Sequence, residues 1–221
     1  MNRIAIDIDE VLVPFLSPMA RYHKQKSGIQ KTDKPKYSYV YRDIFDVTEE
    51  ESQKMVKEFY KSGHFQVLKP IKGSQKAMQI IRRNAEKMYI VTGRQDIVRK
   101  DTELWIDYFF PGIFDDVILT NSYTPNEVKK VDICRALNIG IIIDDNKSIC
   151  DECIESGMTA VNFIGTHIED MYPWCEESEI SLKGWYLLNR SQYTILRFNK
   201  NNLITFTTLH HHLHLPTHSS G

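Results

Sequence analysis

The sequence contains little cysteine, and this limits both its compartment and its chemistry. Four of the 221 residues are Cys, too few for a disulfide framework in a chain of this size. We therefore expect a reducing compartment and a cytoplasmic location. Cys150 and Cys153 have the spacing of a metal-binding pair, but no second pair accompanies them, so we expect two thiols on one face of a helix.

Long apolar runs and an excess of charge of one sign are also missing. No apolar run approaches the ~20 residues that a membrane-spanning helix needs, and strand-like sequence begins by Arg3, where a signal peptide would lie. The 28 basic and 29 acidic residues give a net charge of −1, which favours neither nucleic acid nor a membrane as a partner. With 42% hydrophobic and 26% charged residues, the sequence predicts one globular domain with room for an inserted subdomain.

The stretch from residue 4 to residue 12 organises the rest of the chain. Ile4, Ile6 and Ile8 alternate with smaller or charged residues, which predicts a short buried strand that delivers Asp7 and Asp9 at its carboxyl end. Ligands bind at the carboxyl ends of strands in open α/β sheets, and neighbouring carboxylates repel each other unless a cation lies between them. The pair indicates either a site for a hard cation such as Mg²⁺ or a strand end that is acidic by chance.

Strands and helices alternate along most of the chain. The apolar patterns predict further strands at residues 87–91, 116–120, 141–143 and 159–164. They predict helices at residues 16–27, after a capping box that starts at Thr48, and at residues 73–84, 97–110, 127–138 and 148–156. Five strands with intervening helices indicate the α/β class and a doubly wound parallel sheet.

Polar groups follow four of these strands, at what would be one edge of the sheet. They are Asp7 with Asp9, Thr92, Thr120 with Asn121, and Asp144 with Asp145. Lys129 and Lys130 open a helix shortly before the second acidic pair, from where a lysine could reach the same edge. The sequence therefore predicts one pocket that combines carboxylates, hydroxyl groups and a lysine.

The order and spacing of these groups resemble the four motifs of the haloacid dehalogenase (HAD) superfamily. The motifs are Asp7-Ile8-Asp9-Glu10-Val11-Leu12, Val91-Thr92-Gly93-Arg94, Lys130 and Ile143-Asp144-Asp145-Asn146, and the resemblance covers residues 1 to about 175. Response-regulator receiver domains use similar groups in another order. Within the superfamily, the start of the chain is similar to 5′(3′)-deoxyribonucleotidases, with Phe15 at the matching aromatic position. Tyr172-Pro173-Trp174-Cys175 resembles a group of uncharacterised HAD-like proteins.

The resemblance implies a role for each motif residue. Asp7 is the expected nucleophile, which forms an aspartyl-phosphate, and Asp9 gives a proton to the leaving oxygen and later takes one from the attacking water. The Thr92 hydroxyl is expected to bond a phosphate oxygen. A lysine balances the charge of Asp7 and the phosphoryl group, and the spacing of the residues that follow favours Lys130 over Lys129.

The same resemblance implies Mg²⁺ as the cofactor. Its ligands would be the Asp7 carboxylate, the Asp9 backbone carbonyl and Asp144, with Asp145 as a further ligand or beside the ligands. The implied activity is Mg²⁺-dependent hydrolysis of a small phosphomonoester, with a 5′-nucleotide or deoxynucleotide as one candidate. The alternatives are a catalytically weak binding or scaffold protein of the same fold, and phosphoryl transfer to an acceptor other than water. The sequence leaves the substrate and the oligomeric state open.

Two positions depart from the family patterns. Glu10 stands where many HAD phosphatases carry Gly, and Gly93-Arg94 stands where the nucleotidases carry Ser-Pro. Phe15, Gly93 and Arg94 are the expected substrate-binding residues. Arg94 would either reach a second anionic group of the substrate or be a solvated arginine at a helix start.

An insertion lies between the first two motifs. The core is expected at residues 1–13 and 73–175, and residues 14–72 are expected to form a small helical cap that closes over the site and carries specificity. Tyr37, Tyr39, Tyr41 and Phe45 would either stack on a base or pack inside the cap, and we favour packing.

The C-terminal segment, residues 189–221, breaks the alternating pattern. It contains no acidic residue and is rich in histidine, with His210, His211, His212, His214 and His218. Such a segment either binds transition metals adventitiously or is a poorly ordered extension, and we favour the extension.

Overall fold

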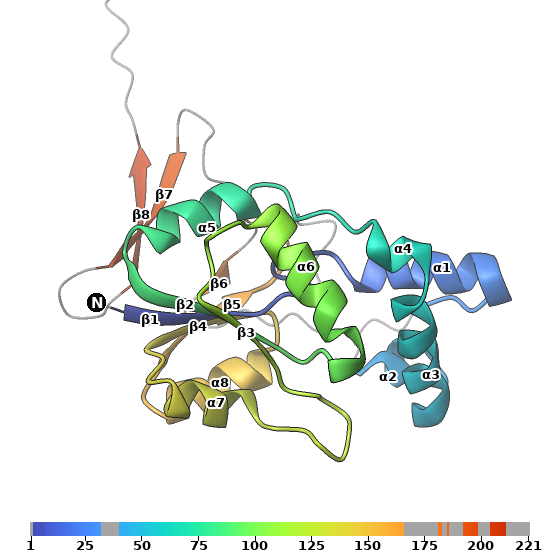
Figure 1. The fold of residues 1–221 in the computed structure, drawn as a ribbon. Coiled ribbons are helices and arrows are strands. Elements are labelled where there is room, and N and C mark those ends of the chain that lie inside the picture. The colour runs from blue at the N-terminus through green and yellow to red at the C-terminus, as the bar shows by residue number, and fades with distance from the viewer. Residues whose placement is uncertain are drawn as a thin grey trace, which may run out of the picture. The chain divides into compact units, whose positions relative to one another are not determined.

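The computed structural model describes residues 2–31, 40–165, 181–182, 185, 192–198 and 204–210. The chain divides into two compact units, the first of which ends at Trp185. Its centre is a parallel sheet with the order β3-β2-β1-β4-β5-β6 (Figure 1). The strands are β1 (Asn2–Ile6), β2 (Ala85–Thr92), β3 (Asp116–Leu119), β4 (Ile141–Asp144), β5 (Thr159–Phe163) and β6 (Ser181–Leu182).

The doubly wound α/β sheet predicted from the sequence is confirmed, but the predicted number of strands is one too small. Strand β6 pairs in parallel with β5 and has two residues. Two residues are too few to show a hydrophobic period, so the sequence pattern gives no signal for this strand.

The position of the first strand explains where ligands should bind. Strand β1 pairs in parallel with β2 on one side and with β4 on the other, with Ile6 opposite Ile143. The strand order reverses between these neighbours, and in open α/β sheets the crevice at such a reversal is the usual ligand site. The backbone N–H of Asp7 donates to the Ile143 carbonyl at 3.0 Å, which extends the pairing to the residue that leaves β1.

Helices cover both faces of the sheet. The helices α5 (Ser74–Arg82) and α6 (Arg99–Phe109) lie on one face, and α7 (Lys130–Ala136) and α8 (Lys147–Glu155) on the other (Figure 1). A short 3₁₀ helix, η1 (Asp96–Val98), precedes α6. Cys150 and Cys153 share α8 and are buried free thiols in the hydrophobic core, as the spacing predicted.

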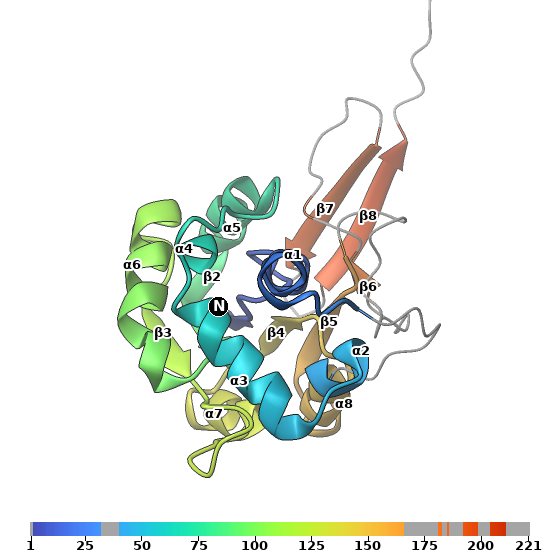
Figure 2. The ribbon, with the colours of Figure 1, turned by 90° about the vertical axis from the view of Figure 1, so that its right-hand side faces the viewer.

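Four helices lie between β1 and α5 in the chain and form the predicted helical insertion. They are α1 (Leu16–Ser27), α2 (Tyr41–Phe45), α3 (Glu49–Tyr60) and α4 (Gly63–Gln66). They gather beyond the carboxyl ends of the strands, and Figure 2 looks from their side with α3 and α1 in front of the sheet. The predicted capping box is present at Thr48 and Glu51, whose side chains each accept from the backbone N–H of the other.

The aromatic side chains of this cap mostly face one another. Phe59 and Phe65 are buried, and their rings lie 5.9 Å apart in an edge-to-face arrangement. Phe45 is buried as well, in agreement with the packing role that we favoured. Tyr37 and Tyr39 lie outside the described residues.

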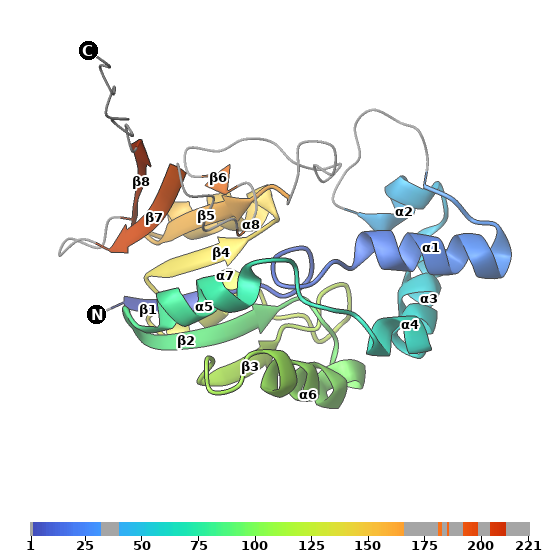
Figure 3. The same ribbon diagram turned by 90° about the horizontal axis from the view of Figure 1, so that it is seen from above.

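The second unit contains an antiparallel hairpin of β7 (Gln192–Phe198) and β8 (Ile204–His210), which Figure 3 shows in red tones. These strands fall in the segment that we expected to be a poorly ordered extension, and its order stays a prediction. The segment does break the parallel α/β pattern, as expected. Beyond His210, the histidines of the tail lie outside the described residues, as does the Tyr172–Cys175 stretch.

Trp185 fastens the end of the first unit to the loop that follows β1. Its indole N–H donates to the Val11 carbonyl at 2.6 Å, and its ring stacks on Phe163 with centroids 5.0 Å apart. Gly73 has a φ of +90°, and a Cβ atom there would lie 2.4 Å from the Trp185 carbonyl oxygen, so this approach requires glycine. The first unit therefore extends past residue 175, where we expected the core to end.

Truncation of the chain after residue 189 should leave one cooperative thermal transition, because the first unit ends at Trp185. Trp185→Ala in the full chain should instead lower the free energy of unfolding by about 3–5 kcal/mol, the usual cost of emptying a buried aromatic site. Denaturant unfolding of the two variants separates these results. Loss of the cooperative transition on truncation would show that the hairpin unit is needed for folding.

Candidate active site

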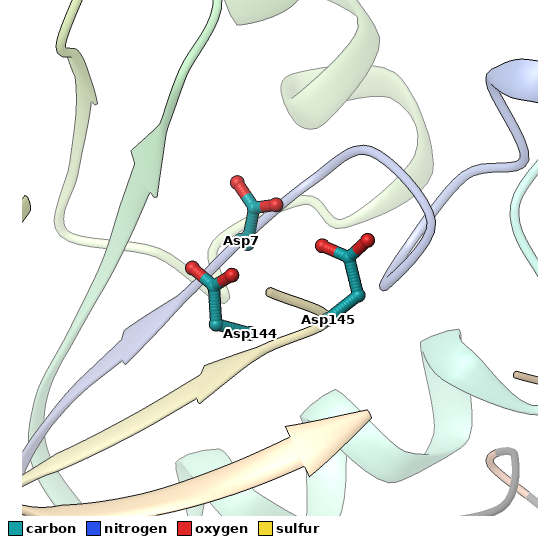
Figure 4. A group of neighbouring side chains, drawn as sticks. All are labelled: Asp7, Asp144 and Asp145. Carbon is teal, nitrogen blue, oxygen red and sulfur yellow. The ribbon is translucent and has the colours of Figure 1, made fainter. Parts of the chain in front are cut away.

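Three carboxylates meet at the carboxyl edge of the sheet. Asp7 follows β1, Asp144 ends β4 and Asp145 follows it, and all three side chains are buried. One oxygen of each lies within 4.8 Å of one oxygen of the others. Figure 4 shows the three side chains directed to the same side of the two strand ends. These are three of the four residues expected to hold a metal.

Lys130 places its positively charged side chain among these carboxylates. Its Nζ lies 2.8 Å from Asp7 Oδ1 and 2.7 Å from Asp144 Oδ2, and the side chain is 6% exposed. Lys129 points elsewhere and pairs with Glu152 on the surface. The structure thus places Lys130, the lysine that we favoured, between the two strand ends, because α7 begins at this residue and directs it to the sheet edge.

The charges of this group shift the pKa values of its members. Burial raises the pKa of Asp7 to about 7, with Lys130 opposing and Asp144 reinforcing the shift. Burial, and then the charges of Asp144 and Asp7, also raise the pKa of Asp145 well above the usual range. Burial alone would lower the pKa of Lys130, but Asp144 and Asp7 outweigh it and raise the pKa of this ammonium group.

The group fits a hard divalent cation. Oxygen ligands from three buried carboxylates suit such an ion, and a cation would offset both the burial and the mutual repulsion that raise the pKa values of Asp7 and Asp145. Lys130 neutralises only part of the negative charge of the three carboxylates, so the net charge of the site is compatible with a bound cation.

Asp9 is not part of this group of three carboxylates and pairs with Arg94. The Asp9 Oδ1 atom accepts from Nη2 of Arg94 at 2.7 Å, and Oδ2 accepts from Nε at 3.0 Å. The sequence suggested either a substrate contact or a solvated arginine at this position. The structure contradicts the solvated arginine, because Arg94 is buried. Arg94 lies on the wall of the same cavity as Asp9, and its contact with a substrate stays a prediction.

Glu10 explains one departure from the family patterns. Its φ of +63° is a left-handed conformation that glycine adopts most readily. Glu10 Oε1 accepts from the backbone N–H groups of Phe15, at 2.9 Å, and Leu16, and so satisfies two donors at the start of α1. These bonds offset the unfavourable backbone conformation and fix the loop between β1 and the cap.

A cavity of about 260 Å³ is lined by Asp7, Asp9 and Lys130 on the core side and by residues of the cap. Thr92 and Gly93 lie on its wall from the end of β2, and a Cβ atom on Gly93 would lie 3.1 Å from Ser122 Oγ. Of the groups expected after β3, Thr120 is buried, whereas Asn121 bonds Asp96 instead. Further lining residues that sequence reasoning missed are Glu49, Ser52, Gln53, Tyr60, Tyr123 and Glu127. No motif marks them, because only folding of the cap brings them to the cavity.

Phe15 lies at the border of core and cap, as expected, and is almost fully enclosed. The side chain is 1% exposed. Its ring makes an edge contact with Phe59 at 5.2 Å and lies near Tyr60 and Phe65, while Tyr41 stacks on it at 6.0 Å. These contacts favour a packing role over direct stacking on a substrate base.

Comparison with known proteins agrees with this geometry. Residues 1–172 match the family described as 5′ nucleotidase, deoxy (pyrimidine), cytosolic type C protein. The chain belongs to this family. It is accordingly a HAD-type phosphatase, and the deoxyribonucleotidase resemblance seen in its first motif extends over most of the chain. The comparison with curated proteins gives no match.

Solved structures share the fold of this nucleotidase-family chain. A HAD-like hydrolase from Streptococcus pneumoniae has a TM-score of 0.55 at 14% identity, covering 74% of this chain and 84% of that one. A protein described as a phosphoglycolate phosphatase from Lactobacillus delbrueckii has a TM-score of 0.52 at 14% identity, with 74% and 87% covered. A HAD-like hydrolase from Bacteroides fragilis has a TM-score of 0.53 at 10% identity, with 73% and 87% covered. At these identities the likeness concerns the fold.

None of the helices described for this nucleotidase-family chain has the length and apolar character needed to cross a membrane.

Proposed function

We propose that this protein hydrolyses a small phosphomonoester, with a nucleotide as the favoured substrate, through an aspartyl-phosphate and with Mg²⁺ as cofactor. The buried contact of Asp7 with Lys130, at the reversal point of the sheet, carries the proposal. It joins a carboxylate nucleophile to a fixed positive charge at the edge where ligands bind. A cytoplasmic location is part of this proposal.

The first half of the reaction transfers the phosphoryl group to the protein. An Asp7 oxygen attacks phosphorus, the bond to the leaving oxygen breaks, and Asp9 gives its proton to that oxygen. Lys130 balances the negative charge of Asp7 and the phosphoryl group, and the Thr92 hydroxyl bonds a phosphate oxygen.

The second half returns the protein to its starting state. A water molecule attacks the phosphorus of the aspartyl-phosphate and gives a proton to Asp9, while the bond between phosphorus and Asp7 breaks. Free phosphate leaves, and Asp9 again holds the proton for the next leaving group.

Asp7, Asp144 and Asp145 would hold the cation, together with the Asp9 backbone carbonyl. When bound, Mg²⁺ neutralises charge between a carboxylate and a phosphate that would otherwise repel each other.

A panel of phosphomonoesters, assayed with and without Mg²⁺, tests the proposal. It should contain 5′-nucleotides, deoxynucleotides, sugar phosphates and an aryl phosphate, with phosphate release as the measurement. Mg²⁺-dependent release from nucleotides supports the proposal. Transfer to an added alcohol, in preference to water, would indicate the phosphotransferase alternative. No release from any ester would indicate the scaffold alternative.

Mg²⁺ should raise the thermal midpoint more at about pH 8 than at about pH 6. Burial raises the pKa of Asp7 to about 7, so near pH 6 most of the metal-free protein carries a proton there that a cation must displace. This pKa lies above that of the unfolded chain, so the metal-free fold loses stability as pH rises toward 7, and bound cation would restore it. Thermal midpoints with and without MgCl₂ at both pH values provide the measurement, with Asp144→Asn as the control that should abolish the shift. Equal shifts at both pH values would contradict this role of Asp7.

Phe15→Ala should lower the free energy of unfolding by about 3–5 kcal/mol, because the ring is enclosed by the aromatic cluster of the cap. It should reduce kcat/KM for a nucleotide and for para-nitrophenyl phosphate by similar factors. A KM increase of roughly ten-fold or more for the nucleotide alone would instead show that Phe15 stacks on the base, a contact worth ~1–3 kcal/mol.

A further inference from the structure

Arg94 is held by the core and covered by the cap. Its side chain is 2% exposed. Nη1 donates to Thr102 Oγ1 at 3.1 Å from α6, and the guanidinium carbon lies 5.1 Å from the centroid of the Phe65 ring in α4. The remaining nitrogens, Nε and Nη2, bond both oxygens of Asp9. Each nitrogen of the guanidinium group thus has a partner within the protein.

This set of partners ties Arg94 to the core and to Asp9. A phosphate or carboxylate of the substrate would have to share nitrogens that already bond Asp9 or Thr102. A guanidinium group that stacks on an aromatic ring and bonds a buried hydroxyl is also fixed in orientation. The partner of its Nε and Nη2 atoms is therefore fixed in orientation too, and that partner is the Asp9 carboxyl group.

We propose that Arg94 is a positioning residue that holds the Asp9 carboxyl group in place for the hydrolysis of the aspartyl-phosphate. The inference rests on the proposed function. A fork of two hydrogen bonds from one guanidinium group, at 3.0 and 2.7 Å, fixes both oxygens of Asp9.

The contact fits one stage of the reaction in particular. Asp9 becomes a carboxylate when its proton goes to the leaving oxygen, and Arg94 continues to hold it. Water next attacks the phosphorus of the aspartyl-phosphate, its proton passes to Asp9, and the phosphorus–Asp7 bond breaks to free the Asp7 carboxylate. Arg94 itself gains and loses no proton, and it acts on the substrate only through Asp9.

Arg94→Lys tests this role, since lysine keeps the charge but cannot form the two-bond fork. An aryl phosphate such as para-nitrophenyl phosphate is the substrate, because its phenolate leaves without needing a proton from Asp9. The first phenolate per protein molecule should be released at the wild-type rate. Later turnovers should be slower by ~10²-fold, the effect of misplacing a reacting group by about 1 Å. Acid-quenched samples should contain more phosphorylated Asp7 than the wild type.

Other results would overturn the inference. A higher KM with unchanged kcat would assign Arg94 to substrate binding. Equal slowing of first and later turnovers, or a lower thermal midpoint with unchanged kcat, would show that Arg94 has only a structural role. A wild-type protein without any turnover would overturn the proposed function and this inference together, whereas an active wild type and an unchanged Arg94→Lys would overturn the inference only.

Two further variants guard against misfolding. Thr102→Val keeps Arg94 but removes the hydroxyl that orients it, and it should slow later turnovers several-fold without slowing the first. Arg82→Lys is the matched control. Arg82 pairs with Asp115 before β3 begins, at the edge of the sheet opposite the site, and the substitution should leave both phases unchanged.

Discussion

Asp7→Asn is expected to reduce turnover by roughly 10⁴-fold or more, the scale seen when an enzyme loses its nucleophile. An amide cannot form the acyl-phosphate, whereas it occupies nearly the same space as the carboxylate. The fold should persist, because Lys130 keeps its contact with Asp144 at 2.7 Å. Phosphate release with Mg²⁺ and the thermal midpoint are the two measurements.

The matched control is Asp107→Asn, an exposed position on α6 that should retain wild-type turnover. Asp9→Asn should be severely impaired, by about 10²–10⁴-fold, because an amide cannot carry the proton. Normal Mg²⁺-dependent hydrolysis by the Asp7 variant would remove Asp7 from the role of nucleophile.

Lys130→Met is expected to lower the free energy of unfolding by about 3–5 kcal/mol and to abolish turnover as well. The methionine fills the space but leaves Asp7 and Asp144 buried beside each other without their shared cation. Burial already raises the pKa of Asp7 to about 7 with the lysine present, so the loss should shrink as pH falls and the carboxyl groups take up protons. Mg²⁺ should restore part of the stability, because it supplies positive charge at the same oxygens.

Lys129→Met serves as the neighbouring control. Lys129 is exposed and its contact with Glu152 lies on the surface, so its removal should change the free energy of unfolding by no more than about 0.5 kcal/mol. Similar losses from the two lysine variants would contradict the central position of Lys130. Denaturant titrations across a pH series measure both.

The positions of the motif residues in the fold could be predicted from the sequence because each depends on a local pattern. Asp7 follows an alternating apolar strand, and Asp144 ends a continuous apolar strand, so their places at the sheet edge follow from strand ends alone. Lys130 could be favoured over Lys129 by spacing, and the first residue of α7 then directs it inward.

Contacts between distant segments could not be predicted in this way. Arg94 and Asp9 are 85 residues apart, and nothing near either one in the sequence indicates that they pair. Phe15 shows the same limit. Its aromatic ring fits both a stacking role and a packing role until the cap places Phe59 against it. The spacing of apolar residues predicts one helix or strand at a time, whereas these contacts depend on how helices and strands pack against one another.

The Val11–Trp185 bond links the loop after β1 to the last residue of the first unit, and this has a consequence for synthesis on the ribosome. Strand β1 leaves the ribosome before its two neighbours, β2 and the much later β4. Pairings over such long stretches of chain form slowly, because loop closure must precede them. The nascent chain therefore carries an apolar strand with one unpaired edge until β4 emerges, and the loop after β1 gains its bond to Trp185 only after that residue has been added. Chaperone dependence during translation is the expected result of this order.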